Sequence, residues 1–317
     1  MKHRRLDFLA AISGVLIALQ ARANGELSHR LENGLQAALI SFSSGLIIIA
    51  TIALFNPAIK QGVRTLSRAV KARDLPPWTL FAGMLGGAFI AVQTHIVPLL
   101  GVAIYSVASI AGQSAVSLLV DRMGLTGGGK KQITPRRVLA ALVTVFAVFI
   151  SVADRLDGKN LSILAVILGV ASGGIVGLQR ALNGRINEHS HQSFTTSFLN
   201  FAMGLTFLTI LLLATYIVGD FDFSPLPSGP WWIYAGGVLG VVYVAFTSTI
   251  VQHLGVLTFT LISVGGQLVG SLLIDLFSPT PGVQISIYLV TGIILTYLGV
   301  LVGGVRNSQL KKAATKK

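Results

Sequence analysis

Leu19-Gln20-Ala21-Arg22-Ala23-Asn24-Gly25 returns 159 residues later as Leu178-Gln179-Arg180-Ala181-Leu182-Asn183-Gly184. The alignment of the two copies needs no gap from residue 14 to residue 46, and matches continue further along the chain: 77–87 with 230–240, and 100–121 with 254–275. A repeat that spans half of the chain indicates a duplication rather than a solenoid. We therefore expect two similar halves, residues 1–156 and 157–317.

The composition is typical of a membrane protein. Hydrophobic residues make up 53% of the 317 residues and charged residues only 11%, with a mean hydropathy of +0.76. Soluble domains contain about 25% charged residues. Apolar runs of about 20 residues, the length that crosses a hydrocarbon core roughly 30 Å thick, follow one another along the chain. We predict an all-α membrane protein with ten transmembrane helices, at 6–23, 35–55, 78–97, 99–120, 137–153, 161–178, 195–218, 231–251, 254–274 and 283–304.

Basic residues are distributed unevenly among the segments that join these spans. If the N-terminus is cytoplasmic, 20 of the 24 Lys and Arg residues lie in cytoplasmic segments, and only Arg22, Arg30, Arg155 and Lys159 lie outside. This positive-inside bias predicts that both termini are cytoplasmic. Topology and contact with anionic membrane lipids also explain the net charge of +13 without a nucleic-acid partner.

Five spans in each half mean that the second half enters the membrane from the opposite side. The loop after the second span carries five basic residues, whereas its counterpart at 219–230 has none and carries two Asp residues instead. Inverted repeats related by an axis in the membrane plane are the architecture of many secondary transporters. We therefore expect two inverted five-helix repeats and transport by alternating access.

Polar side chains inside the spans are the candidate substrate ligands, because such groups are costly in lipid unless they face the bundle interior. Residues four apart, such as Gln20 and Asn24, share one face of a helix. We expect two polar clusters that line gates or vestibules on the two sides of a central cavity, with simple hydrogen bonding between helices as the alternative. The candidates are Gln20, Asn24, Ser41 and Gln267 in the outer half of the membrane, and Gln113, Gln179, Asn183 and Asn200 in the inner half.

Charged residues offer few candidates for ion coupling. No Asp or Glu lies in the middle of a predicted span, which weakens a proton-antiport mechanism. Glu26 and His95 are the possible proton-coupling groups, since histidine as a residue type can exchange a proton near neutral pH. We expect Arg22 and Arg180 to be interfacial charges rather than substrate ligands.

Two motifs carry a resemblance to a known family. Each half contains a Gln-x-x-x-Asn-Gly segment and, in its second span, a Phe-x-x-Gly-Leu segment that starts at Phe42 or Phe201. Together with the ten short helices, they resemble the YdcZ-like branch of the drug/metabolite transporter superfamily over essentially the whole chain. The resemblance implies a multi-pass exporter of the bacterial inner membrane. It also implies a cavity lined by the first four helices of each half, with the fifth and tenth helices at the periphery.

Other functions find little support in the sequence. The chain lacks the Gly-x-Ser-x-Gly, His-Glu-x-x-His and phosphate-loop motifs, and without Cys it can form no disulfide or thiolate metal site. We predict no enzyme activity, no cofactor and no metal. The expected function is export of a small polar or amphipathic metabolite. A flippase for lipids or lipid precursors, a passive channel for small solutes and a scaffold without a solute path are the alternatives, and a homodimer through Gly299 and Gly303 is possible.

Overall fold

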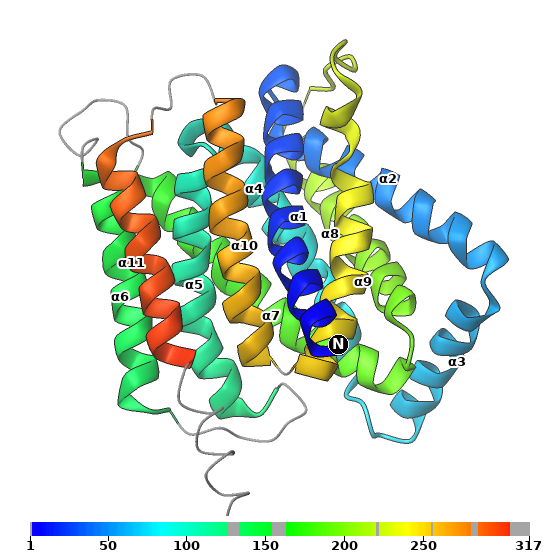
Figure 1. Ribbon diagram of the computed structural model, residues 1–317. Helices are drawn as coiled ribbons and strands as arrows, with labels where there is room; N and C mark the ends of the chain where they lie inside the picture. Colours follow the sequence, from blue (N-terminus) through cyan, green and yellow to red (C-terminus); the bar gives the residue numbers. More distant parts are fainter. Residues whose placement is uncertain are drawn as a thin grey trace, which may run out of the picture.

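A computed structural model describes residues 2–125, 133–153, 163–219, 222–254, 256–279 and 285–304, and the regular structure within them is helical (Figure 1). The long helices are α1 (Lys2–Leu31), α2 (Gly34–Phe55), α3 (Pro57–Lys71), α4 (Ala82–Leu100), α5 (Val102–Met123), α6 (Pro135–Ser151), α7 (Ile163–Ser190), α8 (Ser193–Val218), α9 (Gly236–Leu254), α10 (Val256–Phe277) and α11 (Ile287–Gly304). Short 3-10 turns at Pro77–Phe81 and Trp231–Tyr234 precede α4 and α9. The predicted boundary at 156/157 falls outside the described residues.

The helices are those of a multi-pass membrane protein. In the described part of the chain, six segments are long and apolar enough to cross a bilayer: Leu6–Leu31, Gly34–Phe55, Pro77–Leu100, Val102–Val120, Ile163–Ser190 and Ser193–Val218. Four shorter apolar segments lie in α6, α9, α10 and α11. All ten overlap the spans expected from hydropathy.

Helix α3 was not expected from the sequence, since its residues were assigned to a loop. Its N-terminus is set by Asn56, whose side chain accepts a hydrogen bond from the Ala58 amide, and by a proline at the first helical position. Ile59 and Leu66 are buried on one face, while the four basic residues of the helix are exposed on the other. Hydropathy alone misses such a helix because its mean hydropathy is low. Its signal is the periodic spacing of its few apolar residues along one face.

The first helix of each half is longer than predicted. Helix α1 continues to residue 31 rather than 23, and α7 to residue 190 rather than 178. In α1 the extension carries Arg22, Glu26 and Arg30, which pair at i,i+4 spacing with N–O distances of 3.0 and 2.8 Å. The charges therefore mark a drop in hydropathy and not the end of the helix.

The turn after this helix has the same form in both halves. Glu32 and His191, which are 159 residues apart, both take the left-handed conformation, with φ of 51° and 52°. The next residues, Asn33 and Gln192, then cap α2 and α8 with their side-chain oxygens. A left-handed residue ends one helix and a polar cap begins the next, so that the two helices form a tight hairpin.

Glycines allow the two halves to pack closely at equivalent positions. Gly14 of α1 lies against the Ser263 carbonyl of α10, and its counterpart Gly173 of α7 lies against the Ser109 carbonyl of α5. In both places a Cβ would overlap the neighbouring backbone. Helix α1 thus packs on α10, and α7 packs on α5 in the equivalent way.

Helix directions follow from these contacts. Ala11 and Val15 of α1 lie beside Gly266 and Gly270 of α10, so α1 and α10 run parallel. The same is true of α5 and α7, where Gly112 meets residue 170 and Val116 meets residue 174. Asp275, near the end of α10, contacts the first residues of α5, which makes α5 antiparallel to α10. Helices α1 and α7 therefore run in opposite directions.

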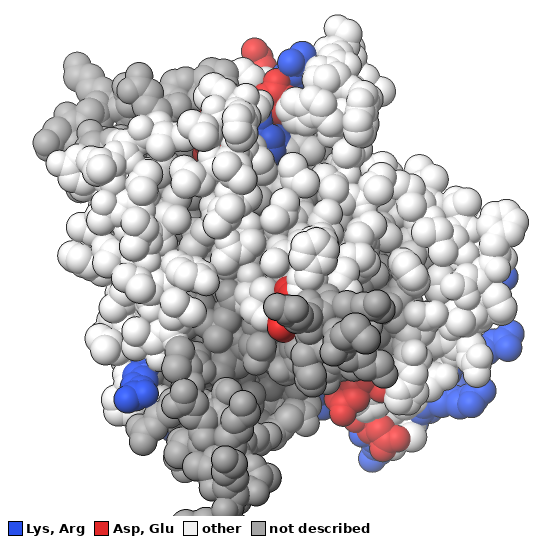
Figure 2. Space-filling view, in the orientation of Figure 1, with Lys and Arg blue, Asp and Glu red and all other residues white. Residues whose placement is uncertain are grey.

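The two connections with contrasting charge lie at opposite ends of the bundle. Residues 222–228 cover the start of α2, where Gln36 exchanges hydrogen bonds of 2.6 and 2.9 Å with Ser224. Helix α3 follows the end of α2 and packs on α7 and α8, where the Thr195 hydroxyl donates to the Ile59 carbonyl at 3.1 Å. The 22 residues of α2 separate these ends by about 33 Å at 1.5 Å per residue. Figure 2 shows Lys and Arg gathered over α3.

Helices α6 and α11 pair with each other at one edge of the bundle (Figure 1). Gly292 lies against Ser151, and Gly299 against Ala140 and Thr144, so the pair is antiparallel. Gly299 is therefore used within the chain and is not free to contact a second copy. Gly303, the other glycine suggested for a dimer contact, lies outside the residues whose side chains are described.

Candidate functional site

Four polar side chains from three helices form a first polar cluster: Gln20 and Asn24 of α1, Ser41 of α2 and Gln93 of α4. All four are buried. The Asn24 amide donates to Gln93 Oε1 at 3.4 Å, and the Gln20 amide donates to the Gly236 carbonyl of α9 at 3.1 Å. Asn24 and Ser41 also lie so close to Gly236 that a Cβ at that position would overlap their side-chain oxygens. The cluster therefore lies at the junction of the two halves.

The first polar cluster is incompletely hydrogen-bonded. Asn24 Oδ1, Ser41 Oγ and Gln93 Nε2 are buried and have no partner in the structure. Leaving a buried polar atom unpaired costs about 1–3 kcal/mol. These atoms are one amide oxygen that accepts, one hydroxyl that can donate or accept, and one amide nitrogen that donates. Together they offer partners for a polar solute or water.

The second polar cluster consists of Gln179 and Asn183 of α7 and Asn200 of α8, the positions that align with Gln20, Asn24 and Ser41. The Gln179 amide donates to Asn200 Oδ1 at 3.3 Å, and the Asn200 amide donates to Asn183 Oδ1 at 3.2 Å. Gln179 also lies against Gly86 of α4, across the junction. Unlike the first cluster, it has no buried side-chain atom without a hydrogen-bond partner.

Phe42 and Phe201 separate the two clusters at the centre of the bundle. Their ring centroids lie 5.0 Å apart with an interplanar angle of 42°. Each ring rests on a glycine of the other half: Phe42 on Gly204, and Phe201 on Gly45. The Phe-x-x-Gly-Leu segments thus form a reciprocal contact, in which the missing side chain of one copy makes room for the ring of the other.

A line of polar groups continues along α5. The Tyr105 hydroxyl hydrogen-bonds with Ser172 Oγ at 3.1 Å, and the side chains of Gln93 and Ser109 also approach it. The Gln113 amide donates to Ser109 Oγ at 3.2 Å. Polar groups thereby extend from the first polar cluster to the middle of α5, inside an otherwise apolar core.

Arg180 is the functional candidate that the sequence reasoning set aside as an interfacial charge. Its Nη1 donates to Gln113 Oε1 at 2.6 Å, and its Nε donates to the Tyr243 hydroxyl at 2.8 Å. Gln113 and Tyr243 are themselves buried. The guanidinium therefore lies within the bundle. It was missed because the predicted span ended at residue 178, whereas α7 continues to residue 190.

The remaining candidates lie apart from the two clusters. Gln267 is buried on α10 beside Gly14 of α1. Glu26 is paired with Arg22 and Arg30 near the end of α1, and Arg22 also donates to Ser278 at 3.1 Å. His95 is exposed on α4. Neither of the suggested proton-coupling groups is in contact with the polar clusters.

Asp275 is buried, although the sequence placed it at the end of a span. Its carboxylate accepts hydrogen bonds from the Val102 and Ala103 amides at 3.3 and 2.7 Å. A carboxylate at this position satisfies the free amides and the positive end of the α5 dipole. Its local role is therefore that of a helix cap. Among the described residues, no three His, Asp or Glu side chains are grouped so as to hold a metal ion.

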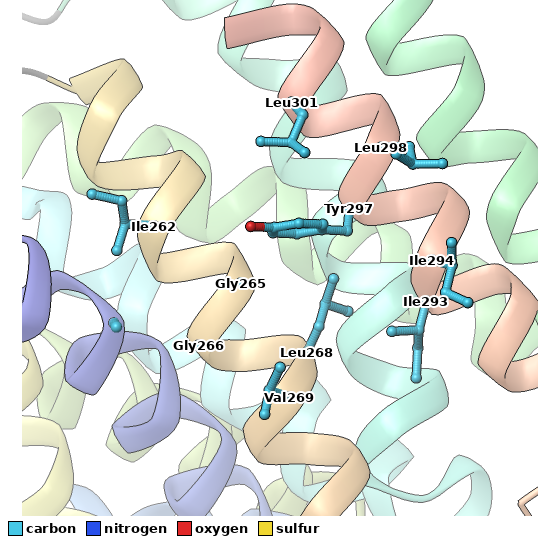
Figure 3. Close-up of a pocket in the computed structure, with 11 residues that line it drawn as sticks. Ile262, Gly265, Gly266, Leu268, Val269, Ile293, Ile294, Tyr297, Leu298 and Leu301 are labelled. Atoms are coloured by element: carbon cyan, nitrogen blue, oxygen red, sulfur yellow. The ribbon is translucent and has the colours of Figure 1, made fainter. Parts of the chain in front are cut away.

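A groove of about 730 Å³ lies between α10 and α11, with Ala11 of α1 at one side. Figure 3 shows the Tyr297 ring reaching from α11 towards Gly265 of α10. The other lining residues are apolar or glycine, with Ile262, Leu268 and Ile293 among them. No basic side chain lines the groove, which suits an acyl chain better than a polar headgroup.

Comparisons with known proteins agree with this architecture. The family described as "Putative inner membrane exporter, YdcZ" matches residues 6–150 and 164–302, one stretch in each half. The chain belongs to this family. It is therefore a multi-pass protein of the inner membrane with a transport function.

A solved structure described only as "Crystal structure of protein" has the same overall fold. It aligns with a TM-score of 0.57 over 96% of this chain and 97% of its own, at 14% sequence identity. At this identity the likeness concerns the fold alone. No curated protein sequence matches the chain.

Proposed function

We propose that this exporter of the YdcZ family is a secondary transporter that moves a small polar metabolite by alternating access. In this proposal ten helices form two inverted five-helix repeats, α3 lies along the cytoplasmic surface, and both termini are cytoplasmic. The opposite directions of α1 and α7 support it. The matching turns at Glu32 and His191, and the reciprocal Phe–Gly contacts, support it further.

One observation carries the proposal most directly. Residues that align in the two halves form two separate polar clusters at the junction between those halves, with the Phe42–Phe201 pair between them. A carrier needs such a pair of sites, because its two halves must part on one side while they stay closed on the other. The first cluster has three buried atoms without a partner and the second has none, which is the asymmetry expected of a single state in such a cycle.

The energies of these contacts suit a gate. Hydrogen bonds between membrane helices are worth about 0.6–2 kcal/mol each. A gate made of two or three such bonds can therefore open at modest cost, and a polar solute can replace the bonds that are broken.

Counterflow in proteoliposomes tests the proposal. Vesicles loaded with a pool of small polar metabolites are assayed for exchange under an imposed pH gradient, first with the unchanged chain. We then expect Gln20→Leu and Gln179→Leu each to reduce saturable exchange at least tenfold, because each removes a polar group from one cluster. Gln61→Leu, an exposed position on α3, is the control.

Protein abundance decides between a transport site and structural bonding. Normal amounts of folded protein together with lost exchange support the proposal. If both variants retain exchange, or if they lose folded protein in proportion to exchange, the clusters hold the helices together and the proposal fails. Flux that rises linearly with solute concentration would instead indicate a channel.

A flippase finds less support. Lipid headgroups need a lateral opening with polar or basic side chains. The groove between α10 and α11 has apolar walls.

A further inference from the structure

Arg180 occupies the middle of the bundle. Gln113, to which it donates, is halfway along α5, and Tyr243 is seven residues into α9. The guanidinium also lies against the Tyr243 ring, with its central carbon 5.7 Å from the ring centroid. Three helices, α5, α7 and α9, thus hold one cation at mid-depth.

No carboxylate of the described residues forms an ion pair with Arg180. Within the described residues, both ion pairs involve Glu26, which pairs with Arg22 and Arg30 near the end of α1. Arg180 has only neutral partners, and its Nη2 is buried without any. An unpaired charge in low dielectric is costly, and an ionisable group within the membrane zone usually marks the path of a ligand of opposite charge.

The cation is present in only one half. At the positions that align with Arg180, Gln113 and Tyr243, the other half has Ala21, Gln267 and Ile90. Packing alone therefore does not require a guanidinium here, because in the other half a buried alanine and a buried isoleucine replace the arginine and the tyrosine, while the glutamine is kept. A charge that is present in only one of the two similar halves indicates a specific partner for that charge.

We propose that Arg180, with Gln113 and Tyr243, binds a carboxylate group of the transported solute, so that the cargo is an organic anion or zwitterion rather than a neutral or cationic compound. The proposal rests on the transport function proposed above and specifies its substrate. A guanidinium presents two parallel N–H groups that match the two oxygens of a carboxylate. The Tyr243 hydroxyl accepts a hydrogen bond from Arg180 Nε, which leaves its own proton free to donate to the same carboxylate.

The polar groups along α5 suit the rest of such a solute. Ser109, Tyr105 and Gln93 continue from the Arg180 site towards the first polar cluster, where unpaired amide and hydroxyl atoms remain. A solute with a carboxylate at one end and hydroxyl, amide or amino groups at the other would find partners along this line.

Binding to the detergent-solubilised full chain tests the site without requiring transport. The probes are propionate and propionamide, which have the same shape and differ in charge, and the measurement is isothermal titration. We expect the unchanged chain to bind propionate and not propionamide. Arg180→Gln should weaken propionate binding at least tenfold, while Arg185→Gln, which removes the same charge from the same helix, should leave it unchanged.

A second variant distinguishes loss of the binding site from loss of folding. Arg180→Lys keeps the charge but loses the planar fork, so we expect propionate binding to weaken several-fold and not to vanish. Size-exclusion elution verifies that each variant is folded. Equal binding of propionamide, or propionate binding that is unaffected by both substitutions at Arg180, would overturn the assignment.

Lipid headgroups could supply the same anionic oxygens. A further arm of the titration distinguishes a lipid ligand from a soluble carboxylate. We expect phosphatidylglycerol in the micelles to leave propionate binding unchanged relative to phosphatidylcholine. Competition by phosphatidylglycerol alone would assign the site to a lipid and reject the solute. Absence of counterflow in proteoliposomes, with propionate binding intact, would instead reject the transport function while the anion site stands.

Discussion

A phenylalanine from each half lies on a glycine of the other half at the centre of the bundle. Gly45 and Gly204 have ordinary helical backbone, so their value here is the absence of a side chain and not conformational freedom. A Cβ at either position would overlap the facing ring. Because the contact is made twice, once in each direction, a change at one glycine alters only half of it.

Gly45→Ala and Gly204→Ala should each destabilise the protein by about 1–3 kcal/mol, the usual cost of overpacking a core. The measurement is the thermal midpoint in detergent by fluorescence-detected size exclusion. Gly184→Ala is the matched control, since an added Cβ there meets nothing within 4 Å, and the helix should become slightly more stable. Equal midpoints for Gly45→Ala and Gly184→Ala would show that the ring moves aside freely.

At the scale of single elements, α3 differs most from the other helices. It buries Ile59 and Leu66 against α7 and α8 and exposes Lys60, Arg64, Arg68 and Lys71. A short helix with one apolar face and one basic face lies in the interface rather than across the membrane. In the proposed topology, its position after α2 places the basic face beside the headgroups of the cytoplasmic leaflet.

Substituting these four basic residues with Gln should release bound anionic lipid. Each Lys or Arg near an anionic surface contributes about 1 kcal/mol, so phosphatidylglycerol retained per protein after purification should fall markedly. Lipid extraction and mass spectrometry provide the measurement. The double variant Gln61→Ala/Ser67→Ala, on exposed positions of the same helix, should retain the lipid of the unchanged chain. Equal retention in the fourfold variant would place α3 away from the membrane surface.

At the scale of the whole molecule, the position of the two charged connections relative to the membrane determines the mechanism. The chain has no cysteine, so a single introduced thiol is an unambiguous reporter. Ser67 on α3 and Asp222 in the loop after α8 are both exposed and lie at opposite ends of the bundle.

We expect Asp222→Cys to react with a membrane-impermeant maleimide added outside intact spheroplasts, and Ser67→Cys to react only after lysis. The reason is the positive-inside distribution, which places the basic connection in the cytoplasm. Labelling in denaturant verifies that both thiols are present. Reaction of both variants from the same side would exclude inverted halves.

The sequence predicted the helices well because each span must satisfy its own backbone hydrogen bonds in lipid, which leaves a long apolar run as the signal. The same logic fails for α3 and for the ends of α1 and α7. Those segments are held by packing and by pairs such as Arg22 with Glu26, and such contacts have no counterpart in local hydropathy.

The candidate site was predicted in part. Alignment of the repeats identified Gln20, Asn24, Gln179 and Asn183, and the structure brings each pair into a polar cluster. Gln93 was recognisable as a polar residue inside the third span, but no local pattern paired it with Asn24, which lies 69 positions away.

The sequence by itself determined the class of the protein, its duplication and its family, because these depend on the composition and order of residues. Only the tertiary structure decided which polar groups meet and which charges are compensated. Arg22 and Arg180 look alike in the chain, yet one is paired with a glutamate on its own helix and the other has neutral partners on two other helices. That difference depends on distances between helices, which a linear pattern does not contain.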